Sequence, residues 1–276
     1  MERRGIRHRL RQALGGSRLK AAEMRVAELE WEISKLRPFE DQPSYRGDMM
    51  ATWYKSVDFL EDPRFMSAYA RGMDSGHSLG RPAGSSMDIH IEWRIHTCCW
   101  AAAHAVNLPG DFAECGVNTG IMSLAVCEYV DFNSTDKTFW LFDTYRGVPP
   151  EQLTDEERAD GREKVPSRYF ECYELAKANF APYPRARLVR GTVPDTFSGL
   201  EIEKVAYLSL DMNIVEPERA ALAYFWPRLV PGAVVVMDDY GWKQFAVQKQ
   251  AHDAFARSQG TEILLLPTGQ GLLIKP

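Results

Sequence analysis

Three aspartates stand where runs of β-forming residues end. Asp211 follows VAYLSL, while Asp238 and Asp239 follow AVVVM. The carboxyl ends of neighbouring parallel strands form the crevice in which ligands bind, so these acids are expected to lie close together. Carboxylates that share a crevice repel one another unless a cation lies between them, and hard oxygen ligands favour magnesium over zinc. The pattern predicts a metal-assisted enzyme; for any single acid, a solvated turn residue is the alternative.

The elements that would carry these acids alternate between strand and helix from Asp111 onward, which is typical of a doubly wound, mostly parallel α/β sheet. The last two apolar runs, EILLLP and GLLIKP, are joined by a turn that is too short for a parallel crossover. The sheet is therefore expected to have seven strands and to end antiparallel. Strands are predicted at 111–116, 138–144, 186–191, 205–211, 233–239, 262–267 and 271–276, with helices at 121–129, 168–180, 217–229 and 245–259.

Composition limits the functional classes. The chain has 276 residues, of which 45% are hydrophobic and 26% charged, enough for one large domain with an appendage. A formal charge of −5 argues against a nucleic-acid partner. The five cysteines are odd in number and form no CxxC pair, which favours a reducing, cytoplasmic setting over a disulfide framework or a zinc site. Because no apolar run approaches the length of a membrane span and the first residues lack an apolar stretch, neither a membrane span nor secretion by a signal peptide is expected.

Residues 1–37 form a first region that is basic at its start and then carries apolar residues spaced alternately three and four apart. This spacing predicts a short coiled-coil helix that ends before Pro38 and favours a homodimer; a helix packed on its own domain is the alternative. The basic start would contact an anionic membrane surface, or else be a solvated tail. The apolar series is Leu19, Ala22, Val26, Leu29, Ile33 and Leu36.

Residues 38–108 form a second region of predicted helices and loops. A break rich in Gly and Ser at 72–86 is typical of a loop that covers an active site, and helical spacing predicts a helix over 89–108. None of the histidines here forms a zinc-binding pair with an acid partner, so none is predicted to be catalytic. These histidines are His77, His90, His96 and His104. Further along, the charged segment 149–167 is predicted to be either a mobile lid or a solvated loop.

The first predicted strand of the sheet is followed by glycines at 116 and 120 only, so the GxGxxG fingerprint of nicotinamide enzymes is absent. Two glycines still let the backbone approach a ligand at the start of the next helix. Asp143 ends the second predicted strand, where it would accept hydrogen bonds from ribose hydroxyls. A nucleoside cofactor without a pyrophosphate fits this arrangement.

Four segments together, GDFAECGVNTG, LFDTYRGVP, LSLDMNIVEPE and PGAVVVMDDYGW, resemble the macrocin O-methyltransferase family over about residues 88–276. The resemblance implies a class I methyltransferase fold, over 109–276, that uses S-adenosylmethionine and Mg²⁺ to methylate sugar hydroxyls. It implies that Glu114 and Gly116 in the first segment, and Asp143 and Thr144 in the second, hold the methionine and ribose parts of the cofactor. The loop of Gly191, Thr192 and Val193 would flank the adenine.

The same resemblance implies that Asp211, Asp238 and Asp239 bind the metal, and that Asp211 is also the general base. Asn213 departs from the family, which usually has a second Asp at that position, and this leaves the acceptor undetermined. Trp242 would stack on a sugar ring or simply pack. Two other functions remain open: a catechol-type or other small-molecule O-methyltransferase, and a scaffold that binds cofactor without turnover.

Overall fold

The computed structural model describes residues 16–36, 42–162 and 169–276 of the chain. The predicted membrane contact of the basic start falls mainly on residues 1–15, outside this range. The described chain divides into two units: Met1–Ser44 with Thr52–Lys55, and Tyr45–Ala51 with Ser56–Pro276. None of the helices in the described part combines the length and the apolar character needed to cross a bilayer.

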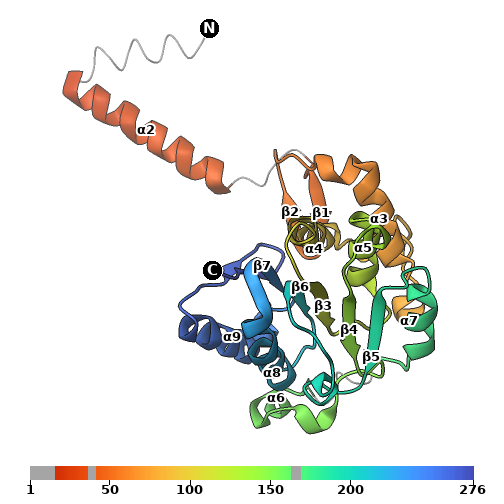
Figure 1. Cartoon of the computed structure of the whole chain (residues 1–276). Helices are drawn as coiled ribbons and strands as arrows, with labels where there is room; N and C mark the ends of the chain where they lie inside the picture. Colours follow the sequence, from red (N-terminus) through yellow and green to blue (C-terminus); the bar gives the residue numbers. More distant parts are fainter. Residues whose placement is uncertain (1–15, 37–41, 163–168) are drawn as a thin grey trace. The chain divides into compact units, whose positions relative to one another are not determined.

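The first unit contains one long helix, α2 (Gly16–Leu36), as the heptad spacing predicts (Figure 1). Its apolar residues face solvent: Val26, Leu29 and Ile33 are 53%, 40% and 50% exposed. In proteins, most of the stability of a helix comes from packing of its apolar face on another surface. The pairing of this helix in a coiled coil stays a prediction.

The second unit is built on a seven-stranded sheet with the order β5-β4-β3-β6-β7-β9-β8 (Figure 1). Strands β3 to β7 are parallel, and β9 is antiparallel to both β7 and β8, as the short last turn predicts. All six residues of β6 are buried, which is typical of a central strand covered on both faces. The strands are β3 (Asp111–Cys115), β4 (Phe139–Asp143), β5 (Ala186–Arg190), β6 (Val205–Leu210), β7 (Leu229–Met237), β8 (Leu264–Leu265) and β9 (Gly271–Ile274).

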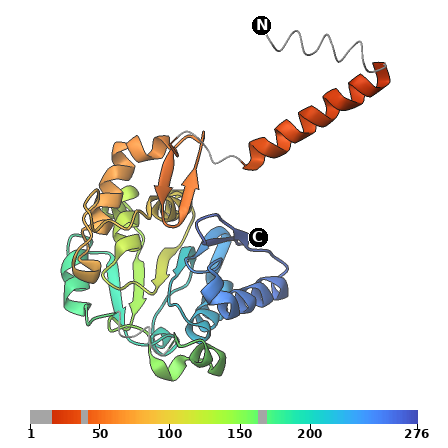
Figure 2. The same ribbon diagram turned by 180° about the vertical axis from the view of Figure 1, so that it is seen from behind.

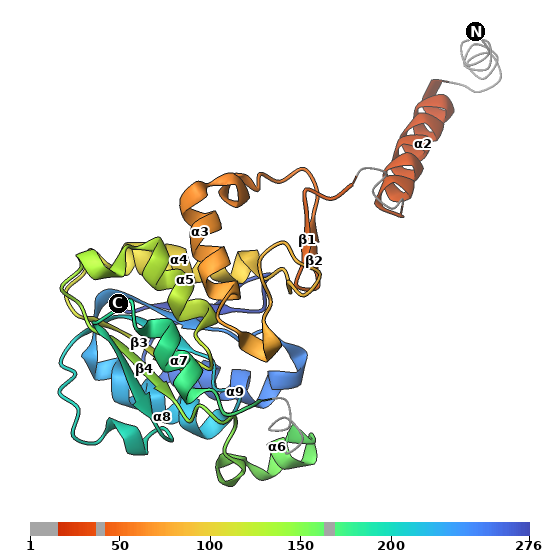
Figure 3. The same ribbon diagram turned by 90° about the vertical axis from the view of Figure 1, so that its right-hand side faces the viewer.

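Helices cover both faces of this sheet. In the side view, α4 and α5 lie on one face and α8 and α9 on the other (Figure 3). Helix α3 packs on α5 and begins with Pro63 behind Asp62, whose side chain accepts a hydrogen bond from the Arg64 amide. The helices are α3 (Pro63–Met73), α4 (Glu92–Ala105), α5 (Ile121–Tyr129), α6 (Asp155–Ala159), α7 (Tyr173–Phe180), α8 (Val215–Phe225) and α9 (Ala246–Ser258).

The structure differs from the predicted elements mainly before the sheet. A two-stranded hairpin of β1 (Tyr45–Gly47) and β2 (Met50–Thr52), visible from behind in Figure 2, lies where helix and loop were predicted. Its turn residues, Asp48 and Met49, have φ of 49° and 58°, and Met49 is not a residue type that signals such a turn. Three-residue strands are also too short to show an alternating pattern.

Candidate functional site

The carboxyl edge of the sheet brings the predicted site residues together. Leu210 pairs with Met237 and Cys115 pairs with Leu210, so the residues after these strands continue side by side. The Asp211 amide donates to the Cys115 carbonyl at 2.8 Å, and the Asp238 amide to the Leu210 carbonyl at 2.9 Å. The strand register itself therefore places Asp211 and Asp238 at one edge.

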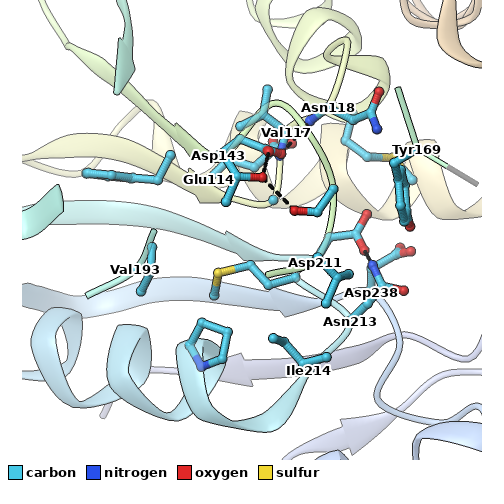
Figure 4. A pocket seen from close by; sticks show the side chains of 18 of the residues that line it. Glu114, Val117, Asn118, Asp143, Tyr169, Val193, Asp211, Asn213, Ile214 and Asp238 are labelled. Carbon is cyan, nitrogen blue, oxygen red and sulfur yellow. Dashed lines mark hydrogen bonds between the residues drawn. The ribbon is translucent and has the colours of Figure 1, made fainter. Parts of the chain in front are cut away.

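A cavity of ≈ 220 Å³ opens at this edge. Among the residues predicted from sequence, Thr192 and Asp239 do not line it, and the other eight do: Glu114, Gly116, Asp143, Thr144, Gly191, Val193, Asp211 and Asp238. Figure 4 shows Glu114 and Asp143 in one part of the site and Asp211, Asn213 and Asp238 in another. All but one of the predicted cofactor residues and two of the three predicted metal ligands thus line one cavity.

Gly116 has to be glycine for two reasons. Its φ is +94°, and a Cβ at this position would lie 1.9 Å from the Asp211 carbonyl oxygen. Side chains are disfavoured at such φ values, and the close approach leaves no room for one. The glycine therefore lets the turn after β3 pack directly on the segment that carries Asp211.

Glu114 is a buried acid, and one of its carboxylate oxygens has no hydrogen-bond partner. It is 2% exposed, its Oε1 accepts a weak hydrogen bond from the Ser123 hydroxyl at 3.4 Å, and its Oε2 has no protein partner. Burial raises the pKa of this carboxyl well above its usual value, and the nearby Asp238 and Asp143 raise it further. A buried carboxylate without a partner is costly, so the site is suited to a cationic group such as the amino group of the cofactor's methionine part.

Asp143 holds the glycine turn by accepting backbone hydrogen bonds. Its Oδ2 accepts from the amides of Val117 at 2.6 Å and Asn118 at 2.7 Å, and its Oδ1 accepts from the Tyr145 amide at 2.5 Å. Each carboxylate oxygen has two lone pairs, so Oδ2 is fully engaged, and a ribose hydroxyl would bind at Oδ1 in place of the weak 3.4 Å bond from the Thr144 hydroxyl. Asp143 is therefore both a candidate ribose ligand and the support of the turn beside it.

The predicted adenine segment follows β5. Gly191 and Val193 line the cavity, and the Val193 carbonyl accepts a hydrogen bond of 2.6 Å from the Gln152 side chain. Thr192 lies outside the cavity, and its hydroxyl donates to Asp195. Gln152 also lines the cavity and was not predicted from sequence.

The three acids at the ends of β6 and β7 have different surroundings. Burial raises the pKa of Asp211 well above its usual value, and the charges of Asp238 and Asp239 add to this. Burial also raises the pKa of Asp239 well above its usual value, and the charge of Asp238 raises it further. Asp239 is 8% exposed, and its Oδ2 has no hydrogen-bond partner. Asp238 has both oxygens engaged, Oδ2 by Arg94 Nη1 at 2.7 Å and Oδ1 by Gln270 Nε2 at 3.1 Å.

The donor set fits a hard divalent cation by its chemistry. Burial, and after it mutual repulsion, raises the pKa of Asp211 and Asp239. Asp239 has an open buried oxygen, and the guanidinium of Arg94 is shared between Asp238 and Asp48. The acids do not converge as closely as a tight chelate. In the described chain, three side chains whose ligand atoms lie within 4.8 Å of one another occur at Asp88, His90 and Glu92. Asp211, Asp238 and Asp239 would have to move closer to share one ion.

Asn213 is fixed on three sides. Its φ is +64°, its amide donates to Glu218 Oε1 at 3.2 Å, and its carbonyl accepts from Arg162 Nη1 at 3.0 Å. Its side-chain Nδ2 donates to Asp211 Oδ1 at 3.0 Å. An aspartate could not donate this bond, so the departure from the family places a neutral donor on the predicted base.

Helix α6 supports the same loop, although the segment 149–167 was predicted to be a mobile lid or a solvated loop. Glu157 is 3% exposed; its Oε1 accepts from the Val215 amide at 2.8 Å, and its Oε2 accepts from the Thr154 amide at 2.9 Å. Arg162 also donates to the Gln244 carbonyl and lies 3.8 Å over the Phe245 ring. The described part of this segment is therefore anchored to the loops that follow β6 and β7.

Several cavity residues were missed by sequence reasoning. Arg94 lies in a predicted helix and carried no motif, yet its guanidinium joins Asp48 to Asp238. His77, expected to be structural or exposed, lines the cavity, and burial lowers its pKa. In the sequence, the only signal was that His77 lies between Gly76 and Gly80. The structure forms a short 3-10 turn there. Trp242 packs on Gly269 and lies 5.2 Å from the Arg94 guanidinium, which agrees with its packing alternative.

Comparison with known proteins gives consistent results. Residues 92–264 match the family model described as macrocin-O-methyltransferase (TylF). The mycinamicin III 3''-O-methyltransferase of Micromonospora griseorubida is 28% identical over 155 residues, which cover 51% of this chain and 59% of that protein. A tetracenomycin 4'-O-methyltransferase of Streptomyces olivaceus, which acts on a dimethoxyrhamnosyl compound by its name, is 29% identical over 150 residues, covering 51% of this chain and 57% of that protein. The chain thus matches less than two thirds of the length of these relatives.

Solved structures show the same fold. The O-methyltransferase NovP superposes with a TM-score of 0.63 at 20% identity, covering 79% of this chain and 97% of NovP. The calicheamicin methyltransferase CalS11 gives 0.51 at 15% identity, covering 85% of this chain and 99% of that one. The expected class I methyltransferase fold is confirmed. Because the family model covers more than half of the sequence, the chain belongs to the macrocin O-methyltransferase family.

Proposed function

We propose that the protein is an S-adenosylmethionine-dependent O-methyltransferase that methylates a hydroxyl of a sugar in a glycoside, polysaccharide or glycolipid. The observation that carries this proposal is that one cavity is lined both by Glu114, a buried acid whose Oε2 has no partner, and by the base candidate Asp211. The relatives support the substrate class, since both are named as O-methyltransferases and the name of the Streptomyces olivaceus enzyme includes a rhamnosyl group.

The cofactor residues divide the work by chemistry. Glu114 Oε2 would accept from the cofactor's amino group, and Asp143 would accept from its ribose hydroxyls while it keeps the glycine turn in place. Gly191 and Val193 would flank the adenine, with Gln152 holding the Val193 carbonyl. When bound, the cofactor supplies an activated methyl group, so the protein has mainly to position and deprotonate the acceptor.

Asp211 is the proposed general base. Its side chain would take the proton of the acceptor hydroxyl, and Asn213 Nδ2 would keep the carboxylate oriented through Oδ1. Asp211, Asp238 and Asp239 would hold Mg²⁺. When bound, this ion would supply positive charge that lowers the pKa of the acceptor hydroxyl. The cytoplasm is the proposed compartment, which suits five cysteines that are all unpaired.

The acceptor would approach between apolar and polar walls. Ile89, Ile91, Ile214 and Tyr169 line the cavity and would contact the faces of a sugar ring, while Asn118 and His77 offer hydrogen bonds to its hydroxyls. This mixture suits a deoxysugar or a partly methylated sugar better than a highly charged one.

The test starts with calorimetric titration of the full chain with S-adenosylmethionine, with and without Mg²⁺. Micromolar binding is expected, followed by formation of S-adenosylhomocysteine with a panel of glycosides. Asp211→Asn should keep cofactor binding and lose turnover. Transfer to catechols but to no glycoside would favour the small-molecule alternative, binding without any turnover would favour the scaffold, and absence of cofactor binding would overturn the proposal.

A further inference from the structure

We propose that helix α2 pairs with the same helix of a second copy of the chain as a parallel, two-stranded coiled coil. The surface concerned is the α2 seam, defined here as Ala22, Val26, Leu29 and Ile33. All four residues are exposed in the described chain. They recur at intervals of four, three and four, which places them along one side of the helix.

The residue types along the seam favour two strands. Val26 and Ile33 occupy the first core position of the repeat, and Ala22 and Leu29 occupy the second. β-Branched residues at the first position and leucine at the second pack well in a parallel dimer, whereas other combinations favour three or four strands. In the sequence, Leu19 and Leu36 continue the same register at the two ends. The seam therefore specifies the number of chains as well as their contact.

The charges beside the seam favour the parallel orientation. Arg25 and Glu30 occupy the two positions that flank the core, five residues apart, so in a parallel pair Arg25 of one copy faces Glu30 of the other. The sequence repeats this spacing with opposite charges at 18 and 23 and again at 32 and 37. An antiparallel pair centred on the seam would bring Arg25 near Glu32, which is favourable, but also Glu23 near Glu30, which is unfavourable, so only the parallel pair places opposite charges together at every flanking position.

Other occupants of the surface fit less well. Met24 and Trp31 are 60% and 64% exposed, but they share one outer position of the repeat and lie away from the seam. Glu23, Glu28, Glu30 and Glu32 lie among the described residues of the helix, and four acids oppose burial against an anionic membrane. A second copy supplies both the apolar seam and the complementary charges.

The orientation is tested with Leu29→Cys in the full chain. In a parallel pair the two introduced thiols face each other, and an oxidant should convert the protein to a cross-linked dimer. The five native cysteines are buried, so they should not compete. A Glu28→Cys variant, outside the seam, should cross-link poorly and serves as the matched control. Equal cross-linking of the two variants, or none of either, would overturn the proposal.

The charge pairing is tested by exchange. Arg25→Glu and Glu30→Arg should each lower the dimer fraction measured by light scattering, because like charges then face each other. A mixture of these two variants, or the double variant, should restore it. Glu28→Arg removes the 2.8 Å bond between Arg25 and Glu28 within one helix and should leave the dimer intact. A monomer in every case, including a monomer that binds anionic vesicles, would refute the pairing. None of these results depends on the proposed methyl transfer.

Discussion

Glu157→Gln tests whether α6 is a fixed support of the β6–α8 loop. The carboxylate accepts from the Val215 amide through one oxygen and from Thr154 through the other. Glutamine has the same shape but only one acceptor oxygen, so in either orientation its NH₂ group faces a backbone N–H. One buried amide then loses its partner.

The magnitude follows from that geometry. Loss of a hydrogen bond to a charged group, together with a buried N–H left unpaired, should lower the free energy of unfolding by about 2–4 kcal/mol. For a chain of this size the melting temperature should fall by about 5–15 °C. Glu156→Gln is the matched control, since Glu156 is the exposed neighbour on the same helix and its change should stay within about 0.5 kcal/mol of wild type.

Urea unfolding measures the free energy, and amide hydrogen exchange locates the effect. Faster exchange is expected at Met212–Val215 in Glu157→Gln, with the β3–β4 region unchanged. If both glutamine variants unfold at the same urea concentration and show identical exchange, α6 does not support the β6–α8 loop. The result would then favour the prediction that segment 149–167 is a mobile lid.

Three further predictions concern the cavity. Gly116→Ala should lower the free energy of unfolding by more than about 2 kcal/mol, because it combines a strained φ with a clash, whereas Gly199→Ala, at φ +79° with nothing within 4 Å, has only the strain; equal losses in urea unfolding would contradict this. Glu114→Gln should weaken binding of S-adenosylmethionine but not of methylthioadenosine, which lacks the amino group. Because burial raises the pKa of Glu114 in the folded protein, its contribution to stability falls as pH rises from the unfolded toward the folded pKa. Because protonation removes the negative charge that would face the amino group, affinity for S-adenosylmethionine should fall as pH falls through the folded pKa. A flat pH profile of binding in calorimetry of the wild type would refute the pairing of Glu114 with the amino group. Arg94→Met should lower the free energy of unfolding by about 3 kcal/mol, since Asp48 and Asp238 lose their cation. Mg²⁺ should raise the melting temperature of that variant more than that of wild type, with KCl of equal ionic strength as control, and equal shifts would argue against a metal site at these acids.

Much of the sheet could be predicted because its signals are local. Helix 121–129 and the strands at both sides of it follow from runs of apolar residues between glycines, and the antiparallel end follows from the length of one turn. Helix α7 begins at Tyr173 rather than 168, and the predicted helix to Leu229 ends at Phe225, because helix ends depend on a few contacts with other segments.

The location of the site could be predicted from the sequence, but the hydrogen-bond partners of its residues could not. Strand periodicity and motif order put Asp211, Asp238 and Glu114 at one edge of the sheet, because parallel strands end together. Which oxygen remains open was not predictable. Asp238 meets Arg94 across 144 positions of sequence, and Arg162 meets Asn213 across 51.

The sequence by itself determined the strands of the sheet, their parallel or antiparallel orientation, and the edge at which the acids lie, since these follow from patterns within short segments. Only the tertiary structure decided which acids are paired, that Asp143 holds the glycine turn, and that α6 is anchored. Single polar side chains carry no periodic signal in the sequence. Their hydrogen-bond partners are set by the packing of segments that are distant in the sequence.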